Sequence, residues 1–105
     1  MVVFMVSYRR DVPFDTAYYF EQHLPLAARV LTPLGLLKSE ILRDITNPQD
    51  GSPASEQIVA LLYFPSRDVL NRALEDPSTA TLMADIRNFY PEDPSYRVAD
   101  VVENS

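Results

Sequence analysis

The stretch "VVFMVSYR" (Val2–Arg9) is a continuous apolar run that is rich in β-branched and aromatic residues. Such a run predicts a buried β-strand. Successive side chains of a strand point to opposite faces, and here both faces are mainly apolar. An antiparallel sheet with one face in water would alternate apolar with polar residues. We therefore expect this strand to belong to a sheet that is covered on both faces.

The residues after this strand predict a helix, two strands, a helical region and a last strand. Asp15 and Ser66 are short polar residues that can cap the N-terminus of a helix. The Asp76–Pro77 pair predicts a restart within the second helical region. The polar segment Asn47–Ser55 predicts a hairpin loop. The expected elements are a helix over Phe14–Leu31, strands over Leu36–Thr46 and Glu56–Phe64, helices from Ser66 onward and a strand over Ser95–Glu103.

This order of elements is the ferredoxin-like βαββαβ pattern, a four-stranded antiparallel sheet with its helices on one face. We expect one α+β domain over residues 1–105. The strand over Glu56–Phe64 is also apolar on both faces, yet two helical regions can cover only one of them. Each large aliphatic side chain left in water would forgo about 1.5–3 kcal/mol. The simplest cover is a second copy, so we expect a homodimer that pairs sheet to sheet as a dimeric α+β barrel.

The composition of the chain excludes several classes of function. Its 105 residues carry a net charge of −6 and include one histidine and no cysteine. An acidic surface argues against nucleic acid and anionic membranes as partners. The absence of cysteine excludes disulfides and thiolate zinc sites, and one histidine excludes a histidine-rich metal site within the chain. No phosphate loop or dinucleotide fingerprint is present, and we expect a cytoplasmic protein without cofactor or metal.

The first helix carries the candidate site. On a helical wheel, Phe20, Leu24, Ala27 and Leu31 form an apolar arc, and His23 lies inside this arc beside Tyr19. Pro25 is expected to interrupt the helix just after His23 and to open room beside the imidazole. We expect His23 and Tyr19 to be the catalytic pair, since histidine is the natural general base near neutral pH. The residues expected to line an aromatic pocket for the substrate are Tyr8, Tyr63, Phe64 and Phe89.

His23 also has a purely structural interpretation. A single histidine on an apolar face is more often a hydrogen-bonded core residue than a catalyst. Asp85 and Asn88, in the second helical region, are expected at exposed helix positions.

The stretch "FDTAYYFEQHLPLA" (residues 14–27) resembles the first-helix signature of the EthD family, in which an aromatic pair is followed by His-x-Pro-Leu. The strand ending in Tyr-Arg, the Pro/Gly-rich hairpin loop, the strand ending in Tyr-Phe and a late Asp-x-x-Asn-Phe helix end (residues 85–89) follow in the family's order. The resemblance implies a dimeric α+β barrel. It also implies that His23 is the family histidine, and it places Tyr18, Tyr19, Pro25 and Leu26 in the signature. Gln22 departs from the pattern, because many members carry a second histidine there.

The resemblance implies three possible functions. The first is cofactor-independent isomerisation, cyclisation, dehydration, decarboxylation or oxygenation of a hydrophobic aromatic or cyclic metabolite, with His23 as acid or base. The second is a non-catalytic accessory or ligand-binding dimer of a degradation or polyketide pathway. The third is haem binding through His23, which is disfavoured because the sequence lacks the tryptophan of haem-degrading relatives.

Overall fold

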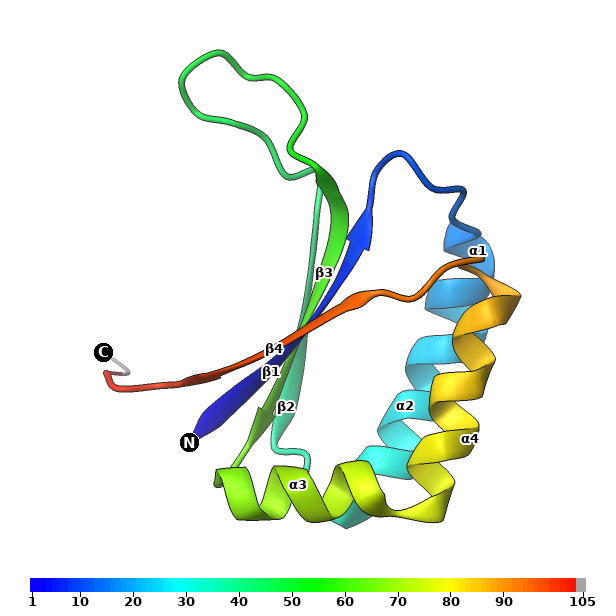
Figure 1. Cartoon of the computed structure of the whole chain (residues 1–105), viewed down its shortest axis with the longest axis vertical. Helices are drawn as coiled ribbons and strands as arrows, with labels where there is room; N and C mark the ends of the chain where they lie inside the picture. Colours follow the sequence, from blue (N-terminus) through cyan, green and yellow to red (C-terminus); the bar gives the residue numbers. More distant parts are fainter. Residues whose placement is uncertain (104–105) are drawn as a thin grey trace.

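A computed structural model describes residues 1–103 and shows a ferredoxin-like α+β fold, as the sequence predicts. Four strands form one antiparallel sheet in the order β2-β3-β1-β4. All helices lie on one side of this sheet (Figure 1). The elements are β1 (Val2–Arg9), α1 (Thr16–Tyr18), η1 (Tyr19–His23), α2 (Leu24–Leu31), η2 (Thr32–Leu34), β2 (Lys38–Arg43), β3 (Glu56–Phe64), α3 (Arg67–Glu75), α4 (Pro77–Asp85), η3 (Ile86–Asn88) and β4 (Ser95–Asp100).

Capping side chains fix the starts of the helices, as expected. The Asp15 carboxylate accepts a hydrogen bond from the Tyr18 N–H, and the Ser66 hydroxyl accepts one from the Val69 N–H. Asp76 caps α4, whose first residue is Pro77. Gly35 follows η2 with a φ of 114°, and a side chain at this position would collide with Val69. Only glycine therefore allows the chain to turn so closely under α3.

The central strands agree with the sequence in both their bounds and their faces. β1 and β3 pair over their whole length, with Phe4 opposite Leu62 and Val6 opposite Ala60. Phe4, Val6 and Ala60 are buried beneath the helices, and the core of the protein lies in this layer. The outer strands are shorter than predicted, because β2 ends at Arg43 and β4 ends at Asp100.

The sequence analysis expected Pro25 to interrupt the first helix, but the helix does not break there. It widens into a π-helical turn, η1, and then continues as α2. The Leu24 N–H bonds to the Tyr19 carbonyl five residues earlier. A π turn holds an extra residue and shifts the phase of the side chains around the helix. Tyr19 and His23 are buried, in agreement with the wheel, whereas Phe20, which the wheel placed in the apolar arc, is 36% exposed.

None of the helices within residues 1–103 is both long enough and apolar enough to span a bilayer.

Candidate functional site

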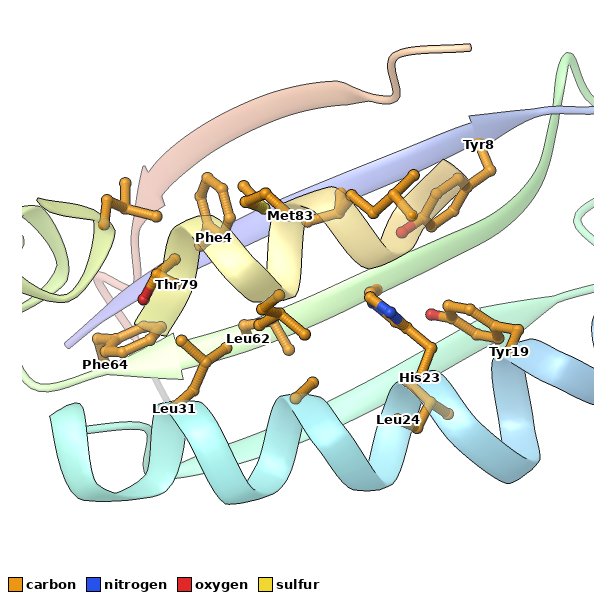
Figure 2. A pocket seen from close by; sticks show the side chains of 16 residues that line it. Phe4, Tyr8, Tyr19, His23, Leu24, Leu31, Leu62, Phe64, Thr79 and Met83 are labelled. Carbon is orange, nitrogen blue, oxygen red and sulfur yellow. The ribbon is translucent and has the colours of Figure 1, made fainter. Parts of the chain in front are cut away.

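The layer between the sheet and the helices encloses a narrow cavity of about 50 Å³. Helices η1, α2 and α4 form one wall, and β1 and β3 form the other (Figure 2). Nearly all of its lining is apolar. The lining residues are Phe4, Val6, Tyr8, Tyr19, His23, Leu24, Ala27, Leu31, Ala60, Leu62, Phe64, Leu74, Thr79, Leu82, Met83 and Ile86.

The polar side chains of the lining gather at one end. Figure 2 shows His23, Tyr19 and Tyr8 at this end, with Leu31, Phe64 and Thr79 at the other. The Thr79 hydroxyl is already occupied, since it donates to the carbonyl of Ala73 at 2.6 Å. The free polar groups of the cavity therefore belong to its His23 end.

The hydroxyl of Tyr19 is buried and has no hydrogen-bond partner among the described residues. Tyr19 is 1% exposed, and its ring stacks on the imidazole of His23 at 5.7 Å between centroids. Tyr8 packs edge-on against Tyr19, also at 5.7 Å. A buried donor without a partner is costly and uncommon in folded proteins. An oxygen atom of a bound molecule would satisfy the Tyr19 hydroxyl.

The imidazole of His23 is held by a carboxylate that the sequence analysis missed. The Nδ1 atom of His23 lies 2.9 Å from Oδ2 of Asp85, the last residue of α4. Asp85 was expected at an exposed position, and this expectation is wrong: its side chain is only 13% exposed. Asn88, in contrast, is exposed as expected. A signal existed in the sequence, because Asp85 is three residues after Leu82 and four before Phe89, on the apolar side of its helix.

The surroundings shift the pKa of each titratable group at this end. Burial lowers the pKa of His23, and the hydrogen bond and charge of Asp85 offset this only in part. Burial opposes ionisation of Asp85, but hydrogen bonds from Tyr18, His23 and Asn88 outweigh it and lower its pKa. Burial also raises the pKa of Tyr8 and Tyr19. At neutral pH the site therefore combines a neutral imidazole, an ionised carboxylate and two neutral phenols.

The structure brings together most of the predicted site residues. Tyr8, Tyr19 and Phe64 line the cavity with His23, although Phe64 lies at the far end. Phe89 is not part of the cavity lining, but its ring packs against the imidazole at 4.5 Å between centroids.

Tyr63 is separated from the other predicted site residues. It lies on the sheet face opposite the helices, where its hydroxyl donates to Glu40 at 2.7 Å and Lys38 lies over its ring. Alternation along β3 turns Tyr63 and Phe64 to opposite faces, so the two side chains cannot line one pocket.

No group of three or more histidine, aspartate or glutamate side chains in the described part of the chain is arranged to hold a metal ion.

A family model described as the EthD domain matches residues 11–93. No curated protein matches the chain.

Three solved structures illustrate the fold. An EthD-like protein from Ralstonia eutropha JMP134 has a TM-score of 0.84 at 20% identity, over 99% of this chain and 94% of that one. An EthD family protein from Bacillus halodurans C-125 has a TM-score of 0.77 at 18% identity, over 95% and 97%. SnoaB, a cofactor-independent oxygenase from Streptomyces nogalater, has a TM-score of 0.71 at 17% identity, over 98% and 94%. At these identities the similarity establishes the shared fold.

Proposed function

Because the chain belongs to the EthD family, we propose that it carries out cofactor-independent proton-transfer chemistry on a small hydrophobic ring compound. His23 acts as the acid or base, and Tyr19 as the hydrogen-bond donor. The observation that carries this proposal is the grouping of a neutral imidazole with an unpartnered phenol hydroxyl at one end of an apolar cavity. Such a cavity favours an apolar molecule with an oxygen atom at one end.

The reaction class follows from the two groups. Nε2 of His23 removes a proton from a carbon next to a carbonyl group, and the C–H electron pair moves into the resulting enolate. The enolate oxygen accepts a hydrogen bond from the Tyr19 hydroxyl, whose raised pKa keeps it protonated. The imidazolium then returns a proton to the same or another carbon. Return to another carbon is an isomerisation, and the same enolate is an intermediate on routes to cyclisation, decarboxylation or oxygenation.

The size of the cavity limits the ligand. A volume of about 50 Å³ holds a few water molecules, whereas sites for drug-sized ligands usually measure about 300–1,000 Å³. A ring compound therefore requires some lining side chains to move. Leu24, Leu74 and Met83 are the candidates, because each is partly exposed, and methionine adapts readily to a new neighbour. This favours one- or two-ring substrates over larger ones.

The similar fold of SnoaB supports chemistry without a cofactor, since that protein is described as a cofactor-independent oxygenase. The hydrogen bond from His23 to a carboxylate also supports a titrating role, because a purely structural histidine is satisfied by a backbone carbonyl just as well. The competing function is a non-catalytic ligand-binding dimer, which needs the cavity but no proton transfer.

The homodimer is part of the same proposal. The sheet face opposite the helices has no covering element in Figure 1. Its centre consists of the partly exposed side chains of Val3, Met5, Val59 and Leu61, which we call the outer patch. Charged residues of β2 and β4 border this patch, as in an interface with an apolar centre and a polar rim. A second copy of the chain would keep the patch dry.

Exchange of α-protons tests the proposed reaction without knowledge of the natural substrate. We expect the wild-type protein in D₂O to replace the α-protons of cyclohexanone, 2-indanone or 2-tetralone by deuterium, as followed by ¹H NMR. Well-positioned acid–base catalysis contributes about 10²–10⁴-fold, so the rate should exceed that of an equal concentration of free imidazole by at least about 10²-fold.

Two results would contradict the proposal. Exchange of all three ketones no faster than with imidazole removes proton transfer as the function. Saturable binding of the ketones without exchange favours the ligand-binding dimer instead.

A further inference from the structure

Asp85 is the centre of a small hydrogen-bonded network that connects the two helices. Its Oδ2 atom faces Nδ1 of His23 at 2.9 Å. Its Oδ1 atom accepts two hydrogen bonds, from the Tyr18 hydroxyl at 2.6 Å and from the Asn88 side-chain amide at 2.9 Å. The Asn88 amide also lies 3.1 Å from the Tyr18 hydroxyl. Both carboxylate oxygens therefore have hydrogen-bond partners, and the two partners of Oδ1 differ from the single partner of Oδ2.

This network fixes where the proton of a neutral His23 resides. An ionised carboxylate can only accept hydrogen bonds, so Nδ1 must carry the proton in the contact with Asp85. The other ring nitrogen, Nε2, then has a free lone pair, and His23 is part of the cavity lining. A base needs this lone pair. The tautomer with the proton on Nε2 would present a donor to the cavity instead of a base.

We propose that Asp85, anchored by Tyr18 and Asn88, is a positioning residue that keeps the proton of His23 on Nδ1 and so makes Nε2 the base of the cavity. The base role rests on the proposed function above, whereas the choice of tautomer stands on the network alone.

The other groups that face the imidazole do not compete with Asp85. Tyr19 stacks on one side of the ring and Phe89 packs against it from the second helical region. Tyr8 reaches the same end of the cavity from β1. Tyr8 and Tyr19 are neutral phenols, because burial raises the pKa of each. Among the described residues, Asp85 is therefore the charged group that faces the ring.

The substitution Asp85→Asn should invert the tautomer. The Asn88 amide and the Tyr18 hydroxyl both donate to the position of Oδ1, so the carbonyl oxygen of the new amide is held there. Its NH₂ group must then face His23 in place of Oδ2. An NH₂ group only donates, so Nδ1 becomes an acceptor and the proton moves to Nε2. The shape of the side chain is unchanged, which preserves the packing.

¹⁵N NMR of the histidine ring reads the tautomer directly, and the single histidine gives an unambiguous assignment. At pH 7.5 we expect the wild-type protein to carry the proton on Nδ1, and the Asp85→Asn variant to carry it on Nε2. We also expect this variant to lose about 10²-fold in the ketone exchange rate. The matched control is Asp93→Asn, which removes an exposed carboxylate paired with Arg87 and should leave the tautomer unchanged.

Wild-type protein with its proton on Nε2 would overturn the inference, and this measurement needs no variant. An Asp85→Asn variant that folds and keeps the proton on Nδ1 would overturn it as well. Failure of the proposed function looks different: the tautomer inverts as expected, but neither protein exchanges ketone protons.

Discussion

Replacement of Leu61 by arginine is expected to turn the proposed homodimer into monomers. Leu61 lies in the outer patch, opposite Met5 on β1 and Glu40 on β2. Moving a guanidinium group from water into an apolar interface costs several kcal/mol, and an ion pair with the neighbouring Glu40 would offset only part of this cost. A loss of about 4 kcal/mol corresponds to roughly a 10³-fold rise in the dimer dissociation constant. Sedimentation velocity at micromolar concentration should therefore detect a dimer for the wild type and a monomer for the variant.

Leu37→Arg is the matched control for this experiment. Leu37 is 57% exposed and immediately precedes β2, so alternation turns it away from the outer patch. We expect the control to remain a dimer. A folded wild-type monomer at micromolar concentration, or a Leu61→Arg variant that stays dimeric, would contradict sheet-to-sheet pairing.

Removal of the imidazole is expected to have the largest effect on the proposed proton transfer. His23→Ala should lower the ketone exchange rate by about 10²–10⁴-fold, because it removes the proton acceptor. Tyr19→Phe keeps the ring in place and removes only the unpartnered hydroxyl, so a loss of about 10²-fold is expected from the missing oxyanion donor. Both rates are measured as deuterium incorporation by ¹H NMR.

His23→Gln separates catalysis from folding in this series. Its amide NH₂ can donate to Asp85 in place of Nδ1–H, but the side chain cannot take up a proton. We expect the variant to match the wild type in thermal stability within a few degrees and to share the inactivity of His23→Ala. A His23→Gln variant that retains most of the exchange rate would exclude His23 as the base.

Interactions between residues that are close in the sequence were enough to predict much of the fold. The caps at Asp15, Ser66 and Asp76 depend on side chains that bond to their own helix, so sequence alone identifies them. The bounds of β1 and β3 follow from two stretches that are mainly apolar and rich in β-branched and aromatic residues. The edge strands were overestimated, since an edge strand ends where its neighbour stops pairing rather than where its composition changes.

The site was harder to predict, for reasons that differ between residues. Tyr63 was placed in the pocket because it is aromatic, although alternation along β3 already separates it from Phe64. The π turn could not be anticipated, because a wheel at about 100° per residue assumes a regular α-helix. Asp85 is 62 positions away from His23, and only the packing of α4 beside the first helix brings the two together. In the sequence itself, the indication of a role for Asp85 is that this carboxylate lies on the apolar side of its helix.

The most direct test is a crystal structure with 2-naphthol, whose hydroxyl on a planar ring imitates the enol of 2-tetralone. We expect the naphthol oxygen within hydrogen-bond distance, about 3 Å, of both Nε2 of His23 and the Tyr19 hydroxyl. The rings should lie between β1, β3, α2 and α4, with Met83 or Leu24 displaced. Naphthol bound elsewhere, with the Tyr19 hydroxyl still unpartnered, would contradict the assignment of this cavity as the active site.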